Sequence, residues 1–448
     1  MEKLKAKQLY RTLWRWHFYA GVFAIPFVIV LSITGALYLF KPQLDAIHDA
    51  PYRNLSVTAP VAAPEQQVAA ALAAVPNATF SAYELPREKT DAVNILLTQA
   101  GEKIRVYVHP QSVQVLLVEH EEKRFLRIVH RLHGELLLGK TGAVLVELAA
   151  CWAIVLVLTG IYLWWPRNAK GIAGILYPRA ALKGRLFWRD LHSVIGIWIS
   201  FFVLFLLLSG LPWALVWGSA FKEVRALTGT SAAQQDWTIA GAKKSVAVDS
   251  EHAEHHSHTV TEAMHSVSHV NDKQVSLNEI VVSAQLLQFA HPVLVSPPSP
   301  KSPDWSVKSN AQNRPLRADA YFSAATGELK SKQHFADRHV LDRAVGIGVA
   351  AHEGQLFGWF NQLLGLLTAV GLVALSVSGF LMWRKRAPNG VLGAPPVMPE
   401  AKIGAGFVVI ILVAAVVLPV LGASLIVLFL VEWIIFARWN RARVWLGL

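Results

Sequence analysis

Long apolar stretches alternate with polar segments along this chain of 448 residues. A helix that crosses a bilayer needs about 20 mainly apolar residues. Four stretches meet this length, at 14–40, 142–165, 187–213 and 359–383. A fifth apolar run, 403–437, is too long for one ordinary span, and Pro419 and Gly422 near its middle predict two short helices joined by a tight turn. The pattern therefore predicts a mainly α membrane protein with about six transmembrane helices, the first of them a retained helix and not a cleaved signal peptide.

Two long polar segments, 41–129 and 214–350, separate the spans of each pair. Each contains a helical stretch, at 65–75 and at 277–288, followed by strand-like alternation of apolar and polar residues. Each segment is therefore expected to fold as a small α+β module. The second also contains an insert, about 228–275, whose low apolar content predicts a flexible loop.

A hairpin is predicted at the same place in both modules. In the first, Tyr107–Val115 has the pattern of strand, turn and strand, with Pro110 in the turn. In the second, Tyr321–Leu329 has the same pattern, with Gly327 in the turn. The unit of span, module and span therefore occurs twice in the chain.

Histidines stand at matching places in the two copies. A shift of 175 residues aligns the first span with the third and places His17 on His192. A shift of 219 residues aligns the second span with the fourth and places His133 on His352. The same shifts align short motifs, namely Thr34-Gly35 with Ser209-Gly210 and Thr159-Gly160 with Ser378-Gly379. Copies of one orientation are related by an axis along the membrane normal, so matching histidines should lie at equal depth and face each other.

Composition supports a membrane protein, and charge predicts its orientation. Hydrophobic residues make up 54% of the chain and charged residues 16%, and the mean hydropathy is +0.39, which is too apolar for a soluble protein of this size. The net charge of +12 comes from Lys and Arg beside the spans, which predicts cytoplasmic termini and is not the footprint of nucleic-acid binding. The modules should then lie in a periplasm-like space. A single cysteine, Cys151, excludes an intramolecular disulfide and a thiolate metal site.

These expectations divide the chain into consecutive parts. They are a cytoplasmic N-terminus with the first span (1–40), the first module (41–129), an interfacial segment with the second span (130–165), a cytoplasmic loop (166–186), the third span (187–213), the second module with its insert (214–350), an interfacial segment with the fourth span (351–386), a second cytoplasmic loop (387–402) and a C-terminal hairpin (403–448). The lipid bilayer is the one partner that the apolar pattern itself predicts.

Three motifs stand near the span ends: Leu13-Trp-Arg-Trp-His-Phe-Tyr-Ala-Gly21, His130-Arg-Leu-His-Gly-Glu-Leu-Leu-Leu-Gly-Lys-Thr-Gly142 and Thr159-Gly-Ile-Tyr-Leu-Trp-Trp-Pro166. With these motifs the chain resembles the PepSY-associated transmembrane family of bacterial inner-membrane proteins, and its hairpins resemble those of PepSY modules. The resemblance implies an association with iron uptake and, as in some relatives, two haems that carry electrons across the membrane to ferric siderophores. The first hairpin has His109 and Ser112-Val113 where the family usually has Asp and Thr-Gly, which weakens any specific role for that turn.

The paired histidines are the strongest candidates for a cofactor site. An ionisable group inside a span is costly and usually has a partner, and neutral imidazole is a good axial ligand for haem iron. His17 and His192 are predicted to hold one b-type haem near the cytoplasmic face. His133 and His352 are predicted to hold a second near the outer face. The alternative is that these are interfacial or surface histidines hydrogen-bonded to backbone or lipid headgroups.

Other residues near these histidines have weaker cases. Gly21 and Gly196 follow the first pair by four residues and could leave room for a flat macrocycle or a close helix. His130, one turn before His133, could be the ligand, a supporting group or an exposed side chain, and its counterpart Val349 favours a lesser role. Basic residues could pair with haem propionates or simply mark the membrane interface, namely Arg127, Arg131 and Lys140 at the outer site and Arg15, Arg185 and Arg189 at the inner site.

The insert of the second module is rich in histidine. Six residues crowd it, namely His252, His255, His256, His258, His265 and His269. They could bind Zn, Cu or Ni, but their spacing matches no structural site, which favours a loose metal-capturing or merely solvated loop. Glu147 and Glu432 are the only carboxylates well inside the apolar runs, which argues against a transport pathway.

The sequence contains no nucleotide-binding Gly-rich loop, no flavin fingerprint and no catalytic triad, so no catalytic side chain is predicted. Electrons must then arrive from a cytoplasmic partner or from membrane quinol. We predict a haem-dependent transmembrane oxidoreductase that reduces a ferric siderophore or similar chelate between the modules and releases iron(II). Two alternatives remain: a non-enzymatic, membrane-anchored interaction protein, and a metal-uptake permease or accessory that collects metal with the His-rich loop.

Overall fold

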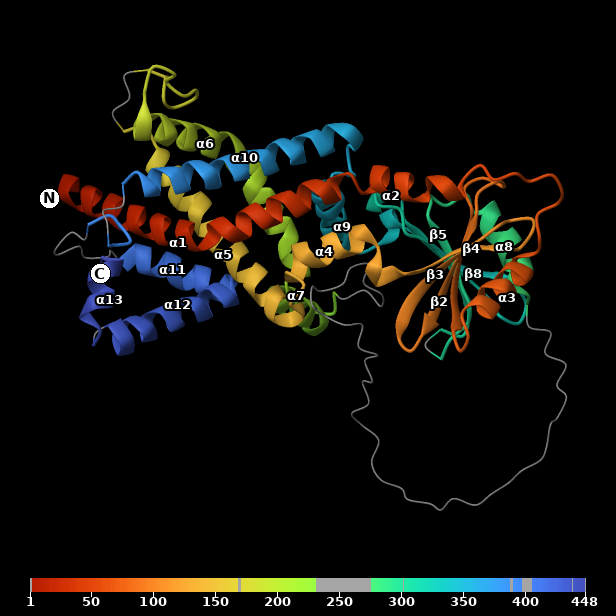
Figure 1. The fold of residues 1–448 in the computed structure, drawn as a ribbon. Coiled ribbons are helices and arrows are strands. Elements are labelled where there is room, and N and C mark those ends of the chain that lie inside the picture. The colour runs from red at the N-terminus through yellow and green to blue at the C-terminus, as the bar shows by residue number, and fades with distance from the viewer. Residues whose placement is uncertain are drawn as a thin grey trace, which may run out of the picture.

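The computed structural model describes residues 2–167, 171–230, 275–300, 302–386, 390–396, 405–436 and 438–447. Within these ranges the chain forms a helical bundle with a β-sheet domain at one end (Figure 1). We call the end of the bundle next to the sheet the sheet side, and the opposite end the far side.

Four of the described helices are long and apolar enough to cross a membrane. They are α1 (Glu2–Leu39), α5 (Gly139–Trp164), α6 (Gly184–Gly210) and α10 (Gly358–Arg384). The first helices of the two repeats, α1 and α6, each pack against both α5 and α10. The four helices therefore close a ring in which equivalent helices stand opposite each other, as an axis along the membrane normal predicts.

The apolar C-terminal run forms the predicted pair of short helices, α11 (Ala405–Val417) and α12 (Pro419–Val431). Each has 13 residues, which is about 20 Å of helix and less than the hydrocarbon core of a bilayer, about 30 Å. The prediction of six spans is thus confirmed for four helices, and the last two form a shorter hairpin beside them. The turn of this hairpin packs Leu418 and Leu421 against Cys151 of α5.

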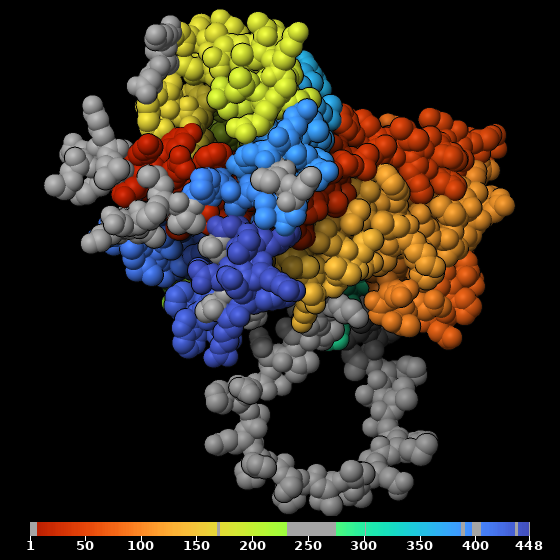
Figure 2. All heavy atoms as spheres, turned by 60° about the vertical axis from the view of Figure 1, so that its left-hand side comes forward, coloured from red at the N-terminus to blue at the C-terminus, as the bar shows by residue number. Residues whose placement is uncertain are grey.

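A further helix, α13 (Asn440–Leu446), brings the C-terminal segment back to the far side of α1. The Tyr19 hydroxyl donates a hydrogen bond to the carbonyl of Leu446 (2.7 Å), and Arg15 donates one to the carbonyl of Gly447 (3.0 Å). Figure 2 turns the far side toward the viewer and shows the C-terminal segment lying against the bundle there. The far side is therefore covered in part by the chain's own C-terminal residues.

The carboxylate of Glu147 lies inside α5 and has a structural partner. It is only 2% exposed, and its two oxygens accept hydrogen bonds from the backbone N–H groups of Val216 (2.8 Å) and Trp217 (3.0 Å). These groups lie in the first turn of α7 (Leu215–Leu227), where helix N–H groups lack partners within the helix. Glu147 therefore anchors α7 to the bundle, which accounts for an acidic residue in a span.

The two polar segments form a single antiparallel sheet of eight strands, in the order β4-β3-β2-β1-β5-β6-β7-β8. The strands are β1 (Thr79–Glu84), β2 (Val93–Gln99), β3 (Glu102–Val108), β4 (Val115–His120), β5 (Val293–Ser296), β6 (Trp305–Ser309), β7 (Ala318–Phe322) and β8 (Leu329–His334). The modules join where β1 pairs with β5, with Tyr83 opposite Val295 and Glu84 opposite Leu294. The sequence predicts two modules but not that their sheets are continuous.

One face of the sheet forms the core of this domain. Helices α3 (Pro64–Ala74) and α8 (Leu277–Leu286), close to the helical stretches predicted from the sequence, cover apolar side chains such as Ile95, Val106 and Val307. The alternate residues point to the other face, which is polar around Glu84, Asn94, Arg105 and Tyr107 and turns toward the bundle. The sheet therefore presents a polar surface to the sheet side of the bundle.

Both predicted hairpins form, and their turns place equivalent residues in the left-handed region. Gly327 has φ +71° in the second turn, and Val113 has φ +60° in the first. The ring nitrogen Nδ1 of His109 accepts hydrogen bonds from the backbone N–H groups of Gln111 and Ser112 (both 3.2 Å). His109 thus closes the turn, a role that short polar side chains commonly have.

Sharp turns connect the sheet domain to the second span of each repeat. In the first copy α4 (Phe125–Glu135) ends at Leu136 and Leu137, both with positive φ, and α5 begins at Gly139. In the second copy α9 (Val340–His352) is followed by Gly354 and Gly358, also with positive φ, before α10. Each copy therefore has a helix break before its second span, and in the first copy the glycines of Gly139-Lys140-Thr141-Gly142 already favour a break. Because of these turns, α4 packs against both α1 and α5, and α9 packs against α6.

Candidate functional site

The far side of the bundle holds one pair of histidines, His17 of α1 and His192 of α6. Their ring centroids are 6.3 Å apart, and the ring planes are at 88°. If one nitrogen of each imidazole binds the same metal ion at about 2.0–2.1 Å, the two ring centroids lie about 6 Å apart. The spacing of this far-side pair therefore fits a metal centre shared between the two rings.

The hydrogen bonding of His17 defines which of its nitrogens is available. Its Nδ1 lies 3.0 Å from the hydroxyl oxygen of Thr159, on α5. The Thr159 hydroxyl donates its own proton to the carbonyl of Val155, 2.6 Å away, so it must accept a proton from Nδ1. This arrangement leaves the lone pair on Nε2 of the neutral ring, which is the form that binds metals.

His192 is held in the same way by α10. Its Nδ1 lies 3.1 Å from the hydroxyl oxygen of Ser378 and 3.1 Å from the carbonyl oxygen of Leu375. A carbonyl can only accept, so Nδ1 of His192 carries the proton and Nε2 has the lone pair. Both rings of the far-side pair are therefore oriented by a partner on the side away from Nε2, as is usual for metal-binding histidines.

The sheet-side pair, His133 and His352, repeats this arrangement at the other end of the bundle. Nδ1 of His133 lies 3.0 Å from the hydroxyl oxygen of Thr34, and Nδ1 of His352 lies 2.9 Å from that of Ser209. Each of these hydroxyls donates to the carbonyl four residues earlier in its helix, at 2.7 Å in both cases. Both histidines therefore donate from Nδ1 and keep the lone pair on Nε2.

A glycine follows each of the four hydroxyl residues and lies directly against the ring. A methyl group added at these glycines would approach the ring carbon Cε1 closely, at 3.2 Å for Gly160 with His17, 3.3 Å for Gly35 with His133, 3.5 Å for Gly210 with His352 and 3.6 Å for Gly379 with His192. Each Thr-Gly or Ser-Gly motif of the repeat therefore holds one histidine ring, by a hydrogen bond to its hydroxyl residue and by contact with its glycine. We call such a motif the seat of that histidine. Of the two roles that the sequence suggests for Gly21 and Gly196, the structure fits the close approach of a helix, because both glycines face leucine side chains of α5 and α10.

The rings of the sheet-side pair are electrostatically coupled and lie outside the spans. Burial, together with the charges of His352 and His130, lowers the pKa of His133 to about 3. Burial also lowers the pKa of His352 to about 4. Part of each ring remains accessible, but protein surrounds both on most sides. At neutral pH these histidines are therefore uncharged, as metal binding requires.

The two pairs are linked through the same helices. Helix α1 carries His17 and the seat of His133, and α6 carries His192 and the seat of His352. Seventeen positions separate each histidine from the seat on its helix, which is about 25 Å along a helix axis. The bundle therefore positions two similar sites near its opposite ends, each built from both repeats.

The structure also distinguishes His133 from His130. His130 is not seated on a Thr-Gly or Ser-Gly motif but packs against Tyr38, with ring centroids 5.5 Å apart. It lines a cavity at the sheet side, and its side chain is exposed there. Of the roles that the sequence leaves open for His130, the structure fits that of an exposed side chain, here between the cavity and the sheet-side pair.

Four of the six basic side chains that the sequence places around the two sites have other partners, and Arg185 is exposed. Arg127 pairs with Glu122 (2.9 Å), and Arg131 pairs with Glu135 (2.8 Å). At the far side, Arg189 pairs with Asp190, and Arg15 binds the C-terminal segment. Lys140 is exposed. The histidines at 252–269 lie outside the described residues. Within the described ranges, no group of three or more His, Cys, Asp or Glu side chains is arranged to hold a metal ion.

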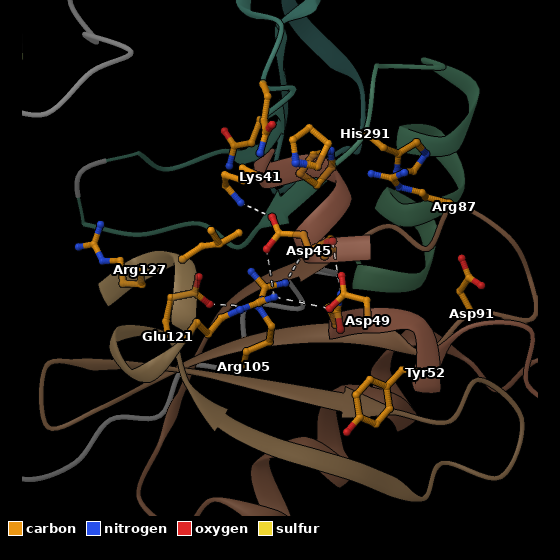
Figure 3. Close-up of a pocket in the computed structure, with 18 of the residues that line it drawn as sticks. Lys41, Asp45, Asp49, Tyr52, Arg87, Asp91, Arg105, Glu121, Arg127 and His291 are labelled. Atoms are coloured by element: carbon orange, nitrogen blue, oxygen red, sulfur yellow. Dashed lines mark hydrogen bonds and ion pairs between the residues drawn. The ribbon is translucent and has the colours of Figure 1, made fainter. Parts of the chain in front are cut away.

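A cavity of 540 Å³ lies between the polar face of the sheet and the bundle. Helix α2 (Lys41–Asp49), strands β1 to β3 and the loops around residues 291 and 314 form its walls, with Tyr38 and His130 on the bundle side. Figure 3 shows Arg105 beside Glu121 in this cavity. The sequence does not predict it, because its lining comes from segments far apart in the chain. In the sequence, the only sign of this cavity is the polar character of one strand face, and such a face usually indicates contact with water.

Comparison with known proteins identifies one family. The model of the PepSY-associated TM region matches residues 14–386 of this chain. A search of curated proteins found no match. The matched region includes the four spans, the whole sheet and both pairs of histidines with their seats.

Proposed function

Because this chain belongs to the family of the PepSY-associated TM region, we propose that it is a bacterial inner-membrane protein that binds two b-type haems and passes electrons to a ferric chelate. In this proposal the far side of the bundle faces the cytoplasm, and the sheet lies in the periplasm. The excess of Lys and Arg in the segments next to the far side supports this orientation.

One observation carries the proposal: all four paired histidines donate from Nδ1 to an oriented acceptor and keep the lone pair on Nε2. A histidine that served only as a structural polar group would have no need of the same tautomer in four places. The separation of the rings of His17 and His192, 6.3 Å, supports axial ligation of one iron by both. The sheet-side pair has the same seats and is proposed to hold the second haem.

Haem bound in these two places would supply one-electron transfer between the two faces of the membrane. The protein's own contribution is to hold each ring at a defined angle, in its neutral form, within a largely apolar bundle. The chain has no nucleotide-binding motif, so we propose that reducing equivalents come from a cytoplasmic partner or from membrane quinol.

The cavity of 540 Å³ is the proposed docking place for the acceptor, a ferric siderophore or similar chelate. It adjoins the sheet-side pair, because Tyr38 and His130 line it and lie next to Thr34 and His133 in their helices. Oxygen chelates hold iron(II) more weakly than iron(III). Reduction of the chelate in this cavity would therefore release the metal.

An absorption spectrum of the purified protein tests the proposal. Bis-imidazole haem gives a sharp α band on reduction, and two haems per chain are expected. The variants His17→Ala and His192→Ala should each lose the same haem, and His133→Ala and His352→Ala should each lose the other. The variant His48→Ala changes an exposed histidine that pairs with Glu119 and should keep both.

Two outcomes would contradict the proposal. A wild-type protein without pigment, even after reconstitution with hemin, would favour a non-enzymatic interaction protein. Equal haem content in all four histidine variants would show that these rings are not the ligands.

A further inference from the structure

The cavity between sheet and bundle is strongly charged, and its charges are unevenly distributed. Eight Lys or Arg side chains and six Asp or Glu side chains line it. The excess of positive charge does not come from the wall formed by α2 and the first module. There Arg105 pairs with Glu84 (2.6 Å) and Glu121 (3.1 Å), and Arg124 lies between further carboxylates. That wall is therefore close to neutral.

The opposite wall, near the junction of the two modules, carries the excess. Arg87 lies there, and it makes no hydrogen bond or ion pair with any residue that the structure describes. His291 lies close enough for the positive charge of Arg87 to lower its pKa, after the larger effect of burial. Figure 3 shows Arg87 and His291 together on one side of the cavity, away from Arg127 and Glu121.

Arg87 and His291 also separate two cavities. Both line the cavity of 540 Å³ and an adjoining one of 340 Å³ beneath α8. An exposed guanidinium that lines two neighbouring cavities and has no carboxylate partner among the described residues is suited to bind a ligand carboxylate through two parallel hydrogen bonds.

Two buried oxygen acceptors also point to a polar ligand. Asn94 and Gln312 line the same cavity, and their side-chain oxygens Oδ1 and Oε1 are buried without a hydrogen-bond partner among the described residues. Buried polar atoms are usually paired. A ligand that carries hydroxyl or amide N–H groups as well as carboxylates could satisfy both acceptors and Arg87.

We propose that this cavity selects anionic, carboxylate-bearing metal chelates and that Arg87 is the residue that sets this preference. The inference rests on the proposed function in taking the ligand of this cavity to be a metal chelate. Neutral chelates, which offer no carboxylate to Arg87, should bind less tightly.

Binding of redox-inert gallium(III) chelates to the purified full-length protein tests the inference without any electron transfer. Gallium(III) citrate is the anionic probe and gallium(III) tris(acetohydroxamate) the neutral one, measured by calorimetric titration. Citrate should bind at least about tenfold more tightly, and Arg87→Gln should weaken citrate binding by about ten- to a hundredfold, the effect of one charge-assisted hydrogen-bond pair. The same variant should leave acetohydroxamate binding unchanged.

Lys123→Gln is the matched control, because Lys123 is exposed and does not line the cavity. It should bind both probes as the wild type does. Equal affinity for the two probes, no measurable binding of either, or citrate binding that Arg87→Gln does not alter would each overturn the inference. Haem content is read separately from the absorption spectrum, so failure of the haem proposal is distinguishable from failure of this one.

Discussion

The ring of His17 lies edge-on to the ring of His192, with 6.3 Å between the ring centroids. The two residues belong to different repeats and are held from different sides, His17 by α5 and His192 by α10. A ligand between these rings would therefore join the two halves of the bundle. The stability of the bundle and the occupancy of the far-side site should be linked, because a ligand that binds only the folded state stabilises it.

The two seats of the far-side pair are not equivalent, which leads to a first prediction. Thr159→Val removes the hydroxyl that accepts from Nδ1 of His17 and leaves only a weaker contact with the Leu156 carbonyl, whereas Ser378→Ala leaves the Leu375 carbonyl 3.1 Å from Nδ1 of His192. Loss of such an orienting partner typically costs about 10- to 100-fold in affinity. Hemin titration of the apoprotein should show a loss of that size for Thr159→Val and a smaller one for Ser378→Ala. The reverse order would contradict the assignment of the seats.

A methyl group at Gly160 should disturb the far-side pair specifically. It would lie 3.2 Å from Cε1 of His17, so the ring would have to move. Gly21→Ala is the matched control on α1, because its methyl group would come no closer than 3.8 Å, to Leu156. We expect Gly160→Ala to shift the reduction midpoint or lower the occupancy of the far-side haem only, with Gly21→Ala unchanged in a spectroscopic redox titration. Equal behaviour of the two variants would argue against a seat at Gly160.

The corresponding test at the sheet side uses Gly142. A methyl group there would lie 1.8 Å from the backbone carbonyl oxygen of Glu135, which no small adjustment can relieve. Gly142→Ala must therefore displace the end of α4 and with it His133. The absorption spectrum should lose the sheet-side haem while the far-side haem stays, and Thr141→Ala, at the exposed neighbouring position, should keep both. Loss of both haems in Gly142→Ala would indicate general misfolding.

The ion pairs under the cavity predict a dependence of stability on pH. Burial alone would raise the pKa of Glu121, but Arg105 and Arg124 outweigh it and hold this pKa below its ordinary value. A carboxylate with a lowered pKa stabilises the fold fully above its unfolded-state pKa, about 4.3, and loses that contribution as the pH falls through its folded-state pKa. The sheet of the wild type should therefore lose stability below about pH 4.

Arg105→Met should lower the stability of the fold at pH 7 and so make that stability less dependent on pH. It leaves Glu84 and Glu121 without their shared cation, which should lower the free energy of unfolding by about 2–3 kcal/mol at pH 7. Near pH 4 Glu121 gains a proton and the deficit should shrink. Denaturant unfolding in detergent at both pH values measures the free energy of unfolding. Lys330→Met is the control, because it breaks an exposed pair with Asp304. It should lower the free energy of unfolding by less than about 1 kcal/mol. A deficit of equal size at both pH values would contradict the role given to Arg105.

Much of the architecture could be predicted from the sequence. Span lengths, the two helices of the sheet domain and the break before Gly139 follow from local apolar periods and glycine, which act within a few residues. The pairing of His17 with His192, and the coupling of His133 to His352, follow from an ungapped repeat. The sequence predicts two short helices after residue 403, but not that each is too short to cross the bilayer, because Pro419 marks a break and does not define where either helix begins or ends.

The function of the Thr-Gly and Ser-Gly motifs could not be predicted in the same way. The sequence shows that they recur, but His17 is held by Thr159, a residue 142 positions away on another helix. Which helices are neighbours depends on how all four pack together. The choice between His130 and His133 was open for the same reason, because only the turn after α4 determines which of the two reaches Thr34.

The sequence by itself thus determined a duplicated membrane bundle with two pairs of histidines, because apolar length and repeated motifs are properties of the chain that need no knowledge of contacts. The tertiary structure alone decided which nitrogen of each ring is available, that two modules share one sheet, and that a charged cavity lies between sheet and bundle. These features depend on distances between segments far apart in the chain, and packing sets such distances only once the whole fold is formed.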